Sequence, residues 1–417
     1  MINDSGNKLI LFGAGKIGRS FIGQLFSRGG YEVVFVDVFK PVIDELNNRH
    51  SYRVVVKDDI ESEIVVQNVR GVFAGDQEEV IGEIATARLV AVSVGLHGLK
   101  SIIPLIAKGL IARYQSPQAT PLDIIIAENL RNAAEFMNNE LKKYLPEDYP
   151  IEQRVGLIET SIGKMVPIML KKEMEADILQ VFAEPYNTLI LDKKGFKNPI
   201  PAIEGLAPKE NMKAWVDRKL FIHNLGHATT AYLGYLAHPQ STFLYEVLSD
   251  QSIKEKVRQT MLQAAAILLA KYPDEFTMDA LIDHTDDLIR RFQNKALGDT
   301  VFRVGCDLQR KLGKEDRMAG AIHLACELRL PYDLILQGLV AGFHFRAKDE
   351  AGNLLPADME FAAIYAKSIK QVMTTVCGFD ENSDTNLINE AIEFDRIIRP
   401  KTILKNERAA KKIHPFF

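Results

Sequence analysis

A lysine, an asparagine and a histidine stand close together in the middle of the chain, in the segment DRKLFIHNLGHATTAYLGY. They are Lys219, Asn224 and His227. On an α-helix of about 100° per residue, Asn224 lies about 140° and His227 about 80° from Lys219. All three side chains then point into one half of the helix surface, and the spacing favours a single shared site.

These three residue types fit the oxidation of a secondary alcohol. The reaction needs a base for the hydroxyl proton, and a lysine serves when burial and nearby positive charge lower its pKa from about 10.4. An asparagine amide can donate a hydrogen bond to the developing alkoxide, and a neutral histidine can bind another hydroxyl. Taken singly, each residue is more often a solvated side chain, a helix cap or a satisfied core group. We assign no role to the adjacent His223.

A glycine-rich loop near the N-terminus has the spacing of a dinucleotide site. It connects an expected strand, Lys8–Phe12, to an expected helix from Ile17 to about Arg28. In G-x-G-x-x-G loops the first glycine permits a tight turn, the second admits the pyrophosphate, and the third allows close packing of helix on strand. The helix N-terminus offers free N–H groups to the phosphates. The residues expected to bind the dinucleotide are Gly13, Ala14, Gly15, Ile17 and Gly18.

An acidic residue ends the second expected strand, Glu32–Val36. Asp37 follows Gly18 by 19 residues. A carboxylate at this position accepts hydrogen bonds from the adenosine ribose hydroxyls and repels the additional phosphate of NADP. The predicted cofactor is therefore NAD. The alternative, a glycine turn with an incidental acid, would require the strand, the spacing and the acid to coincide by chance.

A second asparagine, Asn129, follows another expected strand, Asp123–Ala127. In open α/β sheets, ligands bind outside the carboxyl ends of the strands. We therefore expect Asn129 to face the nicotinamide end of the cofactor. Together with Asn224 and Lys219 it would complete a metal-independent alcohol dehydrogenase site.

The elements around these residues change character near residue 200. The apolar runs Leu89–Gly95 and Asp123–Ala127 flank a helical run, which is typical of parallel strands in βαβ units. The segment 197–208 is rich in proline and glycine and predicts a linker. Beyond it, long helical patterns such as Ser252–Lys271 dominate. We predict an α/β Rossmann-type dinucleotide-binding domain over residues 1–200, followed by a mostly α-helical domain over residues 201–417.

The composition of the chain indicates which kinds of molecule it is expected to bind. The 417 residues include 51 Lys and Arg against 55 Asp and Glu, and this slightly acidic balance argues against a nucleic-acid partner. The three cysteines have no spacing that suggests zinc or a disulfide framework, so we expect no metal and a reducing compartment. No signal peptide is recognisable, and no stretch approaches the roughly 20 apolar residues of a membrane span. We therefore expect a cytoplasmic protein with a small-molecule substrate and no membrane partner.

The chain resembles the polyol-specific long-chain dehydrogenases over nearly its whole length, and within them the mannitol-1-phosphate 5-dehydrogenases. The matching segments are Phe12–Gly23 (FGAGxIGRxFIG), Asn48–Tyr52 (NRHSY), Ala127-Glu128-Asn129, the K-x-x-x-x-N-x-x-H signature from Lys219 to His227, and RFxN…D…RVG…RKL…DR from Arg291 to Arg317. The resemblance implies a general acid/base role for Lys219, alkoxide stabilisation by Asn129 and Asn224, and substrate contact by His227. It also implies the absence of a catalytic metal.

The resemblance further implies a phosphorylated substrate, with mannitol 1-phosphate and NAD converted to fructose 6-phosphate and NADH. Guanidinium and ammonium groups bind phosphate through charge-assisted hydrogen bonds. The candidate phosphate ligands are Arg303, Lys311, Arg317 and Arg131. These cations could equally form ordinary ion pairs within the protein.

Two segments depart from the resemblance. Gly163–Pro167 (GKMVP) stands where those enzymes carry an Asp-Arg pair before Val-Pro, and Glu184–Asn187 (EPYN) replaces a stretch with a tryptophan. The departures favour a related dehydrogenase for an unphosphorylated polyol or a hexonate, of the mannitol 2-dehydrogenase or altronate/mannonate oxidoreductase type. A non-catalytic NAD-binding sensor is a further alternative. It predicts the loss of Lys219 or Asn224, and both are present.

Overall fold

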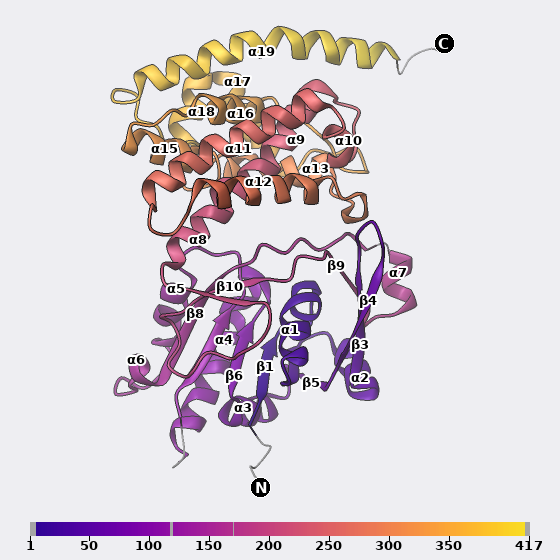
Figure 1. Ribbon diagram of the computed structural model, residues 1–417, viewed down its shortest axis with the longest axis vertical. Coiled ribbons are helices and arrows are strands. Elements are labelled where there is room, and N and C mark those ends of the chain that lie inside the picture. The colour runs from indigo at the N-terminus through magenta and orange to yellow at the C-terminus, as the bar shows by residue number, and fades with distance from the viewer. Residues whose placement is uncertain (1–5, 117–119, 170, 413–417) are drawn as a thin grey trace. The chain divides into compact units, whose positions relative to one another are not determined.

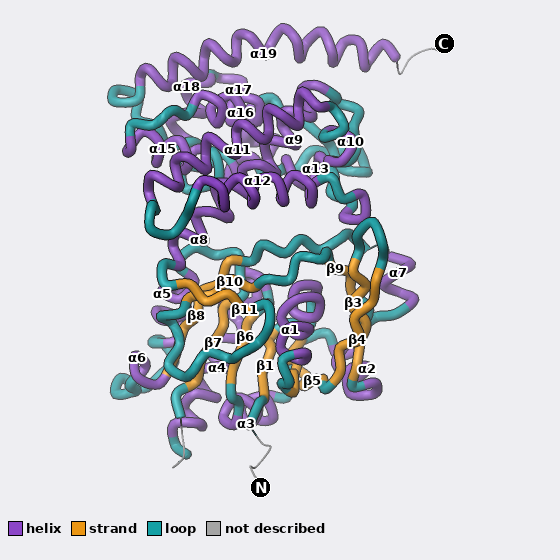
Figure 2. Tube along the Cα trace, in the orientation of Figure 1, coloured by secondary structure: helices purple, strands orange, loops and turns teal. Residues whose placement is uncertain are grey.

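The computed structural model describes residues 6–116, 120–169 and 171–412 and divides into two compact units, of which the first ends at Val216 and the second begins at Asp217. Figure 1 shows the order of the elements along the chain. The first unit combines strands and helices, whereas the second is helical (Figure 2). The predicted fold class, a Rossmann-type unit followed by a mostly helical one, is confirmed.

A large sheet forms the centre of the first unit. Its strands are β1 (Lys8–Phe12), β2 (Glu32–Asp37), β5 (Val69–Phe73), β6 (Leu89–Val92), β7 (Leu122–Ile126), β8 (Val155–Ser161), β10 (Leu189–Asp192) and β11 (Leu206–Lys209). Their order is β11-β10-β8-β7-β6-β1-β2-β5. Every neighbouring pair is parallel except β8 and β10. A second, three-stranded sheet has the order β4-β3-β9, with β3 (Ser51–Val56), β4 (Ser62–Gln67) and β9 (Val181–Ala183).

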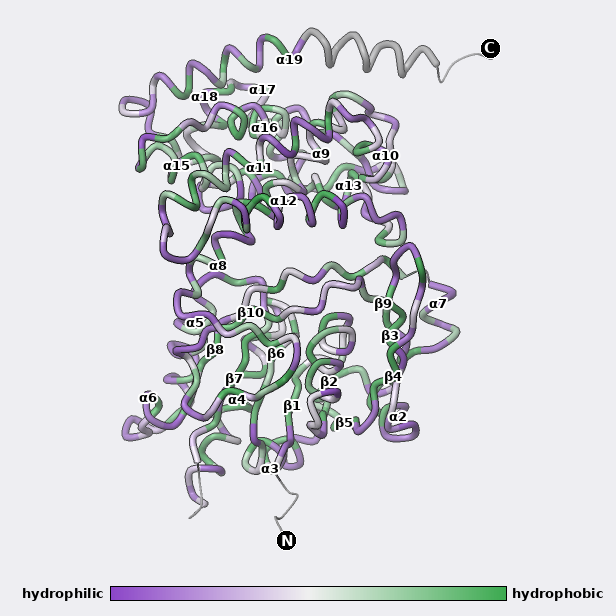
Figure 3. Tube along the Cα trace, in the orientation of Figure 1, coloured by the Kyte–Doolittle hydropathy of each residue, from purple (hydrophilic) through white to green (hydrophobic). Residues whose placement is uncertain are grey.

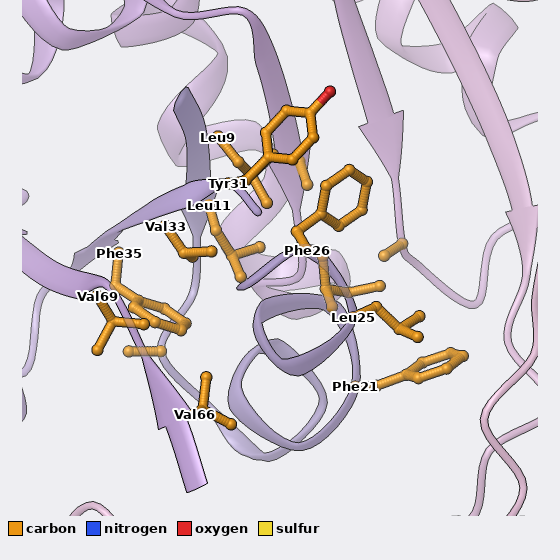
Figure 4. Packing of buried hydrophobic residues seen from close by; sticks show 14 of the residues in the cluster. Leu9, Leu11, Phe21, Leu25, Phe26, Tyr31, Val33, Phe35, Val66 and Val69 are labelled. Carbon is orange, nitrogen blue, oxygen red and sulfur yellow. The ribbon is translucent and has the colours of Figure 1, made fainter. Parts of the chain in front are cut away.

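Most residues of the parallel strands are apolar because both faces of the sheet are covered (Figure 3). Leu9 and Leu11 of β1 belong to one buried cluster, while Ile10 and Phe12, between and beside them, belong to another. This alternation is the two-residue period of a strand. Figure 4 shows the first cluster, in which the β1 and β2 side chains pack against Phe21, Leu25 and Phe26.

Helices supply the covering layers of the first unit. They are η1 (Gly18–Gly23), α1 (Gln24–Arg28), α2 (Lys40–Arg49), α3 (Gln77–Thr86), α4 (Gly95–Tyr114), α5 (Ala133–Leu141), α6 (Ile151–Arg154) and α7 (Lys171–Ala176). Residues of η1, α1 and α2 share the first cluster, and residues of α3, α4 and α5 share the second. The glycine loop therefore lies between a buried strand and a helix packed on the same sheet.

Helix α4 is long and apolar enough to cross a membrane by length and composition, and it is the one such helix in the part of the chain that the structure describes. Our expectation that no stretch approaches this length was wrong. The helix contains Pro104, and its Leu99, Ile103 and Ile106 pack in the second buried cluster of the first unit. This burial against the sheet accounts for its apolar composition. The cytoplasmic location stays a prediction.

The second unit is a bundle of helices that continues from α8 (Met212–Arg218). Its elements are η2 (Lys219–Asn224), α9 (Leu225–Ala237), α10 (Leu244–Val247), α11 (Gln251–Lys271), α12 (Met278–Phe292), η3 (Lys295–Leu297), α13 (Val301–Gly305), α14 (Leu308–Lys311), α15 (Ala319–Leu328), α16 (Asp333–Phe343), α17 (Pro356–Lys367), α18 (Ile369–Thr375) and α19 (Thr385–Lys412). Helix α9 packs against α11, and Gly226 allows the close approach, because a Cβ there would lie 2.3 Å from the Met261 sulfur.

The linker expected over residues 197–208 is wrong in its second part. Residues Leu206–Lys209 form β11, which extends the large sheet by pairing with β10. Prolines and glycines in this segment suggested irregular backbone, but Pro208 occupies an edge strand, where a missing N–H is tolerated. The division between the compact units accordingly falls at 216/217, beyond the predicted boundary at 200.

Candidate active site

The glycine loop has the backbone shape that a dinucleotide requires. Gly13 has a φ of +97°, and a Cβ on it would lie 2.1 Å from the Ser93 carbonyl oxygen. A Cβ on Gly18 would lie 2.0 Å from the Gly13 carbonyl oxygen. Gly15 is different, since it is exposed and no atom lies within 4 Å of its missing Cβ. Gly13 and Gly18 thus fold the loop, and Gly15 leaves open space for a ligand.

Asp37 lies against the same loop. Its Oδ2 accepts a hydrogen bond of 2.7 Å from the Ala14 N–H, and its Oδ1 accepts one of 2.8 Å from the Phe39 N–H. A carboxylate has about four acceptor positions, so two remain for hydroxyl groups. Ile17, which begins the following helix, packs half-buried against the first cluster. The six predicted dinucleotide residues therefore come together at one end of β1 and β2.

Asn129 is exposed and follows β7, at the carboxyl end of the parallel sheet. The residue before it, Glu128, is buried and accepts hydrogen bonds from the Val94 and Gly95 N–H groups, at 2.7 and 2.9 Å. These groups lie at the N-terminus of α4, where a carboxylate is stabilised by the helix dipole. Glu128 thereby holds the chain next to Asn129. Glu128 belongs to the motif Ala127-Glu128-Asn129, but the motif does not predict its contact with the helix N-terminus.

Lys219 and Asn224 begin and end a π-helical turn, η2, within a longer helix. The Leu225 N–H donates to the Leu220 carbonyl, five residues earlier. The assumption of a regular α-helix was therefore wrong here. Because a π-helix is built on i→i+5 hydrogen bonds, two residues five positions apart, such as Lys219 and Asn224, come onto the same side. Single π turns inside α-helices are frequent at functional sites.

The electrostatic surroundings of Lys219 suit a base. Burial, together with the smaller effect of the positive charge of Arg317, lowers the pKa of its ammonium to about 8, against a smaller opposing effect of Asp316. Arg317 donates to Asp316 at 2.7 Å and, at 3.4 Å, to the Asn224 carbonyl oxygen. Near neutral pH such a lysine can both accept and release a proton.

Asn224 is partly exposed, and its side-chain amide makes no hydrogen bond within the part of the chain that the structure describes. Its backbone carbonyl accepts the hydrogen bond from Arg317. The amide can therefore donate to an oxygen that lies beside Lys219. The geometry of η2 thus supports the predicted pairing of a base with an amide donor.

His227, one turn further along α9, is tightly enclosed. Its ring stacks on Phe292 at 4.6 Å between centroids, and its Nε2 lies 2.8 Å from Asp299 Oδ2. Burial lowers the pKa of His227, which the hydrogen bond to Asp299 only partly offsets. His223 is buried and lies against the rings of both His227 and Phe292. Burial, followed by the charge of Arg291, lowers its pKa well below the ordinary value. Both imidazoles are therefore neutral near pH 7.

The predicted phosphate ligands all have protein neighbours. Arg303 forms an ion pair with Asp299. The Lys311 ammonium is buried and donates to the Val304 carbonyl at 2.8 Å, next to the end of α13. Arg317 pairs with Asp316 as described, and Arg131, in the first unit, lies near Glu159, whose pKa its charge lowers slightly against a larger effect of burial. Their role as phosphate ligands stays a prediction.

The two segments that differ from the mannitol-1-phosphate 5-dehydrogenases, Gly163–Pro167 and Glu184–Asn187, contact each other in the first unit. Lys164 donates to the Tyr186 carbonyl at 2.8 Å and to Asn187 Oδ1 at 3.0 Å, and the Met165 N–H donates to Glu184. Lys164 also lies 5.2 Å from the centre of the Phe21 ring in η1. The two departures therefore form one packed unit, a coupling that the sequence did not reveal.

Metal ligands were not expected. Among the residues that the structure describes, no three His, Cys, Asp or Glu side chains gather in a way that could hold a metal ion. Metal-independent catalysis stays a prediction, because a substrate or cofactor could add ligands of its own.

A Rossmann unit with a dinucleotide loop, followed by a helical unit with a lysine of lowered pKa, defines a class of two-part dehydrogenases. Residues 7–205 match the mannitol dehydrogenase Rossmann domain, and residues 211–394 match the mannitol dehydrogenase C-terminal domain. The chain belongs to the mannitol dehydrogenase family of polyol dehydrogenases.

Two solved structures are similar over almost the whole chain. A D-sorbitol dehydrogenase in substrate-free form has a TM-score of 0.80 and 18% identity, with 95% of this chain and 94% of that chain covered. The mannitol 2-dehydrogenase of Pseudomonas fluorescens, in a ternary complex with NAD and D-mannitol, has a TM-score of 0.72 and 15% identity, with coverage of 99% and 96%. At such identities the likeness establishes the fold.

Proposed function

We propose that the protein is an NAD-dependent dehydrogenase that moves a hydride between nicotinamide and the carbon of a polyol hydroxyl. One observation carries the proposal: a single π turn presents a lysine with a pKa of about 8 and an uncommitted asparagine amide. The dinucleotide loop of the first unit supplies the other requirement of hydride transfer.

The cofactor assignment rests on the loop and on Asp37. Open space at Gly15 fits a pyrophosphate, and the loop N–H groups precede a helix N-terminus, which favours negative charge. The remaining acceptor positions of Asp37 fit the ribose hydroxyls of NAD, and its charge opposes the phosphate of NADP. When bound, NAD accepts the hydride. The similar structure of a mannitol 2-dehydrogenase in complex with NAD supports NAD as the cofactor.

In the proposed reaction, Lys219 removes the hydroxyl proton during oxidation and returns it during reduction. Asn224 donates to the same oxygen as negative charge develops on it, and Asn129 of the first unit is the proposed second donor. His227 binds a neighbouring hydroxyl. No step requires a metal, because the lysine and the amides stabilise the alkoxide.

The substrate is proposed to be an unphosphorylated polyol or the corresponding ketose. Arg303 is paired with Asp299, and the Lys311 ammonium donates to a backbone carbonyl at a helix end, so both groups are already engaged within the protein. The similar solved structures are a D-sorbitol dehydrogenase and a mannitol 2-dehydrogenase with D-mannitol, which supports a hexitol.

A phosphorylated substrate, mannitol 1-phosphate, is the second candidate. Arg317 favours it, because this mostly buried guanidinium lies beside Lys219 and Asn224 and could bind an anion at the same site. The carboxylate of a hexonate substrate would bind the same Arg317 guanidinium.

A substrate panel decides between these candidates. NADH and NADPH consumption are measured with fructose, fructose 6-phosphate and a keto-hexonate, before and after dialysis against a strong chelator. We expect NADH to be preferred, fructose to be used at least as efficiently as its phosphate, and chelation to have no effect. If fructose 6-phosphate were preferred by 100-fold in kcat/KM, about 2.7 kcal/mol of transition-state binding, the second candidate would replace the first. Equal use of NADPH would refute the assignment to Asp37.

A further inference from the structure

Asp299 is held rigidly beside His227. Its backbone carbonyl accepts a hydrogen bond of 2.9 Å from the Leu244 N–H, and the next residue, Thr300, forms an isolated antiparallel bridge with Phe243. Its side chain is buried, with Oδ1 paired to Arg303 and Oδ2 at 2.8 Å from His227 Nε2. Main chain and side chain are thus fixed independently, and the carboxylate has little freedom to turn.

The protonation state of this pair follows from the surroundings. Burial alone would raise the pKa of Asp299, but the hydrogen bond with His227 and the charge of Arg303 bring it below the ordinary value, so the carboxylate is charged. The imidazole is neutral, since burial lowers the pKa of His227. A carboxylate can only accept a hydrogen bond, so the single imidazole proton resides on Nε2.

The other ring nitrogen is then an acceptor. Within the described residues, Nδ1 of His227 has no hydrogen-bond partner. The ring cannot easily turn over, because it stacks on Phe292 with an interplanar angle of 11° and meets His223 at its edge. Nδ1 therefore offers a lone pair in a fixed direction, on the helix that also carries Lys219.

We propose that Asp299 is a positioning residue that sets the tautomer of His227, so that Nδ1 accepts a hydrogen bond from a polyol hydroxyl other than the one being oxidised. The inference rests on the proposed function, in which His227 binds substrate. It assigns a recognition rule to the site: the polyol must donate a proton at this position, so a hydroxyl fits and an ether or methoxy group does not.

The substitution Asp299→Asn tests this assignment with almost no change of shape. Arg303 is a donor, so the amide oxygen turns toward it and the amide N–H₂ faces His227. Nε2 must then accept, the proton moves to Nδ1, and the substrate hydroxyl must accept a hydrogen bond at this position instead of donating one. We expect the KM for polyol to rise about tenfold, the equivalent of about 1.4 kcal/mol, with little change in kcat or in the KM for NAD.

A matched control exists in the same unit. His344 and Asp395 form another buried pair with the same separation, 2.8 Å between Nε2 and Oδ1, and this pair ties α19 to α16. Asp395→Asn should reduce thermal stability and leave the KM for polyol unchanged. A similar rise in KM in both variants would mean that Asp299 has only a structural role, and would overturn the proposal.

The tautomer itself is measured without activity. In protein labelled with ¹⁵N-histidine, the nine histidine signals are assigned with the help of a His227→Gln variant. We expect a proton on Nε2 of His227 in the wild type and on Nδ1 in Asp299→Asn. A wild-type proton on Nδ1 would refute the inference even if the enzyme oxidises polyols.

A double-variant comparison separates this inference from the proposed function. If Asp299 acts through His227, then Asp299→Asn adds nothing to the KM of a His227→Ala variant. If the two effects add fully, Asp299 acts by another route and the proposal fails. Absence of polyol oxidation in the wild type would instead reject the proposed function, while the NMR result would still decide whether Asp299 sets the tautomer.

Discussion

A π-helical turn follows the glycine loop in the first unit, and another carries Lys219 and Asn224 in the second. In η1 all six residues are buried, and glycines stand at both ends. A Cβ on Gly18 would meet the Gly13 carbonyl, and a Cβ on Gly23 would lie 2.6 Å from the Phe35 ring. In η2 the two end residues remain partly exposed. The first turn serves backbone packing, and the second presents side chains.

The polar groups of the two turns differ accordingly. Ser20 Oγ and the Gln24 side-chain amide, in and just after η1, are buried and have no hydrogen-bond partner among the described residues. Such groups cost about 1–3 kcal/mol each unless water reaches them. In η2 the freed Asn224 carbonyl has Arg317 as a donor. The backbone shape of η1 therefore costs stability, because buried polar groups in and just after it lack hydrogen-bond partners among the described residues. In η2, by contrast, the hydrogen bond from Arg317 stabilises the turn beside Lys219 and Asn224.

The largest effect should follow from removing the base in η2. For Lys219→Ala we expect kcat to fall by roughly 10²–10⁴, the range of a general acid–base group, with NAD affinity nearly unchanged. Steady-state kinetics and NAD titration measure the two quantities. Lys271→Ala, which removes a surface lysine paired with Glu327 in the same unit, is the control. A variant that keeps more than about a third of wild-type turnover would exclude Lys219 as the base.

An intermediate effect should separate two glycines of the dinucleotide loop. Gly15→Ala should leave thermal stability unchanged, because its Cβ has open space, but weaken NAD binding by roughly tenfold or more, because the pyrophosphate needs that space. Gly18→Ala should lower the free energy of unfolding by about 1–3 kcal/mol, because its Cβ collides with backbone. Thermal denaturation with and without NAD distinguishes the two. Equal destabilisation by both substitutions would contradict the assigned roles.

The sequence was sufficient for the elements whose signal is local. The apolar runs and the glycine spacing predicted β1, β2 and β7 to within one residue and placed the end of β6 three residues too late, and the position of Asp37 followed from the strand end. The π turn was not predicted, and the hydrogen bond on its Asn224 carbonyl comes from Arg317, which is distant in sequence. The same holds for the Asp299–His227 contact, which joins residues 72 positions apart.

The smallest effect should be a shift in pH dependence. Polyol oxidation needs the neutral amine of Lys219, so its kcat/KM should rise through a pKa of about 8, whereas ketose reduction needs the ammonium and should decline through the same pKa. Arg317→Gln removes a positive charge and leaves Asp316 without that partner. Both changes favour the ammonium, so the midpoint should move upward.

The shift should remain smaller than the displacement of Lys219 from its ordinary value of 10.5, because burial is the larger cause and persists in the variant. Arg310→Gln provides the control, since Arg310 also faces Asp316, at 3.5 Å, whereas Arg317 is the cation that lowers the pKa of Lys219. Its midpoint should match the wild type. A downward shift in Arg317→Gln, or equal shifts in both variants, would mean that Arg317 does not lower the pKa of Lys219. The contrast between η1 and η2 would then rest on packing and exposure alone, without an electrostatic difference.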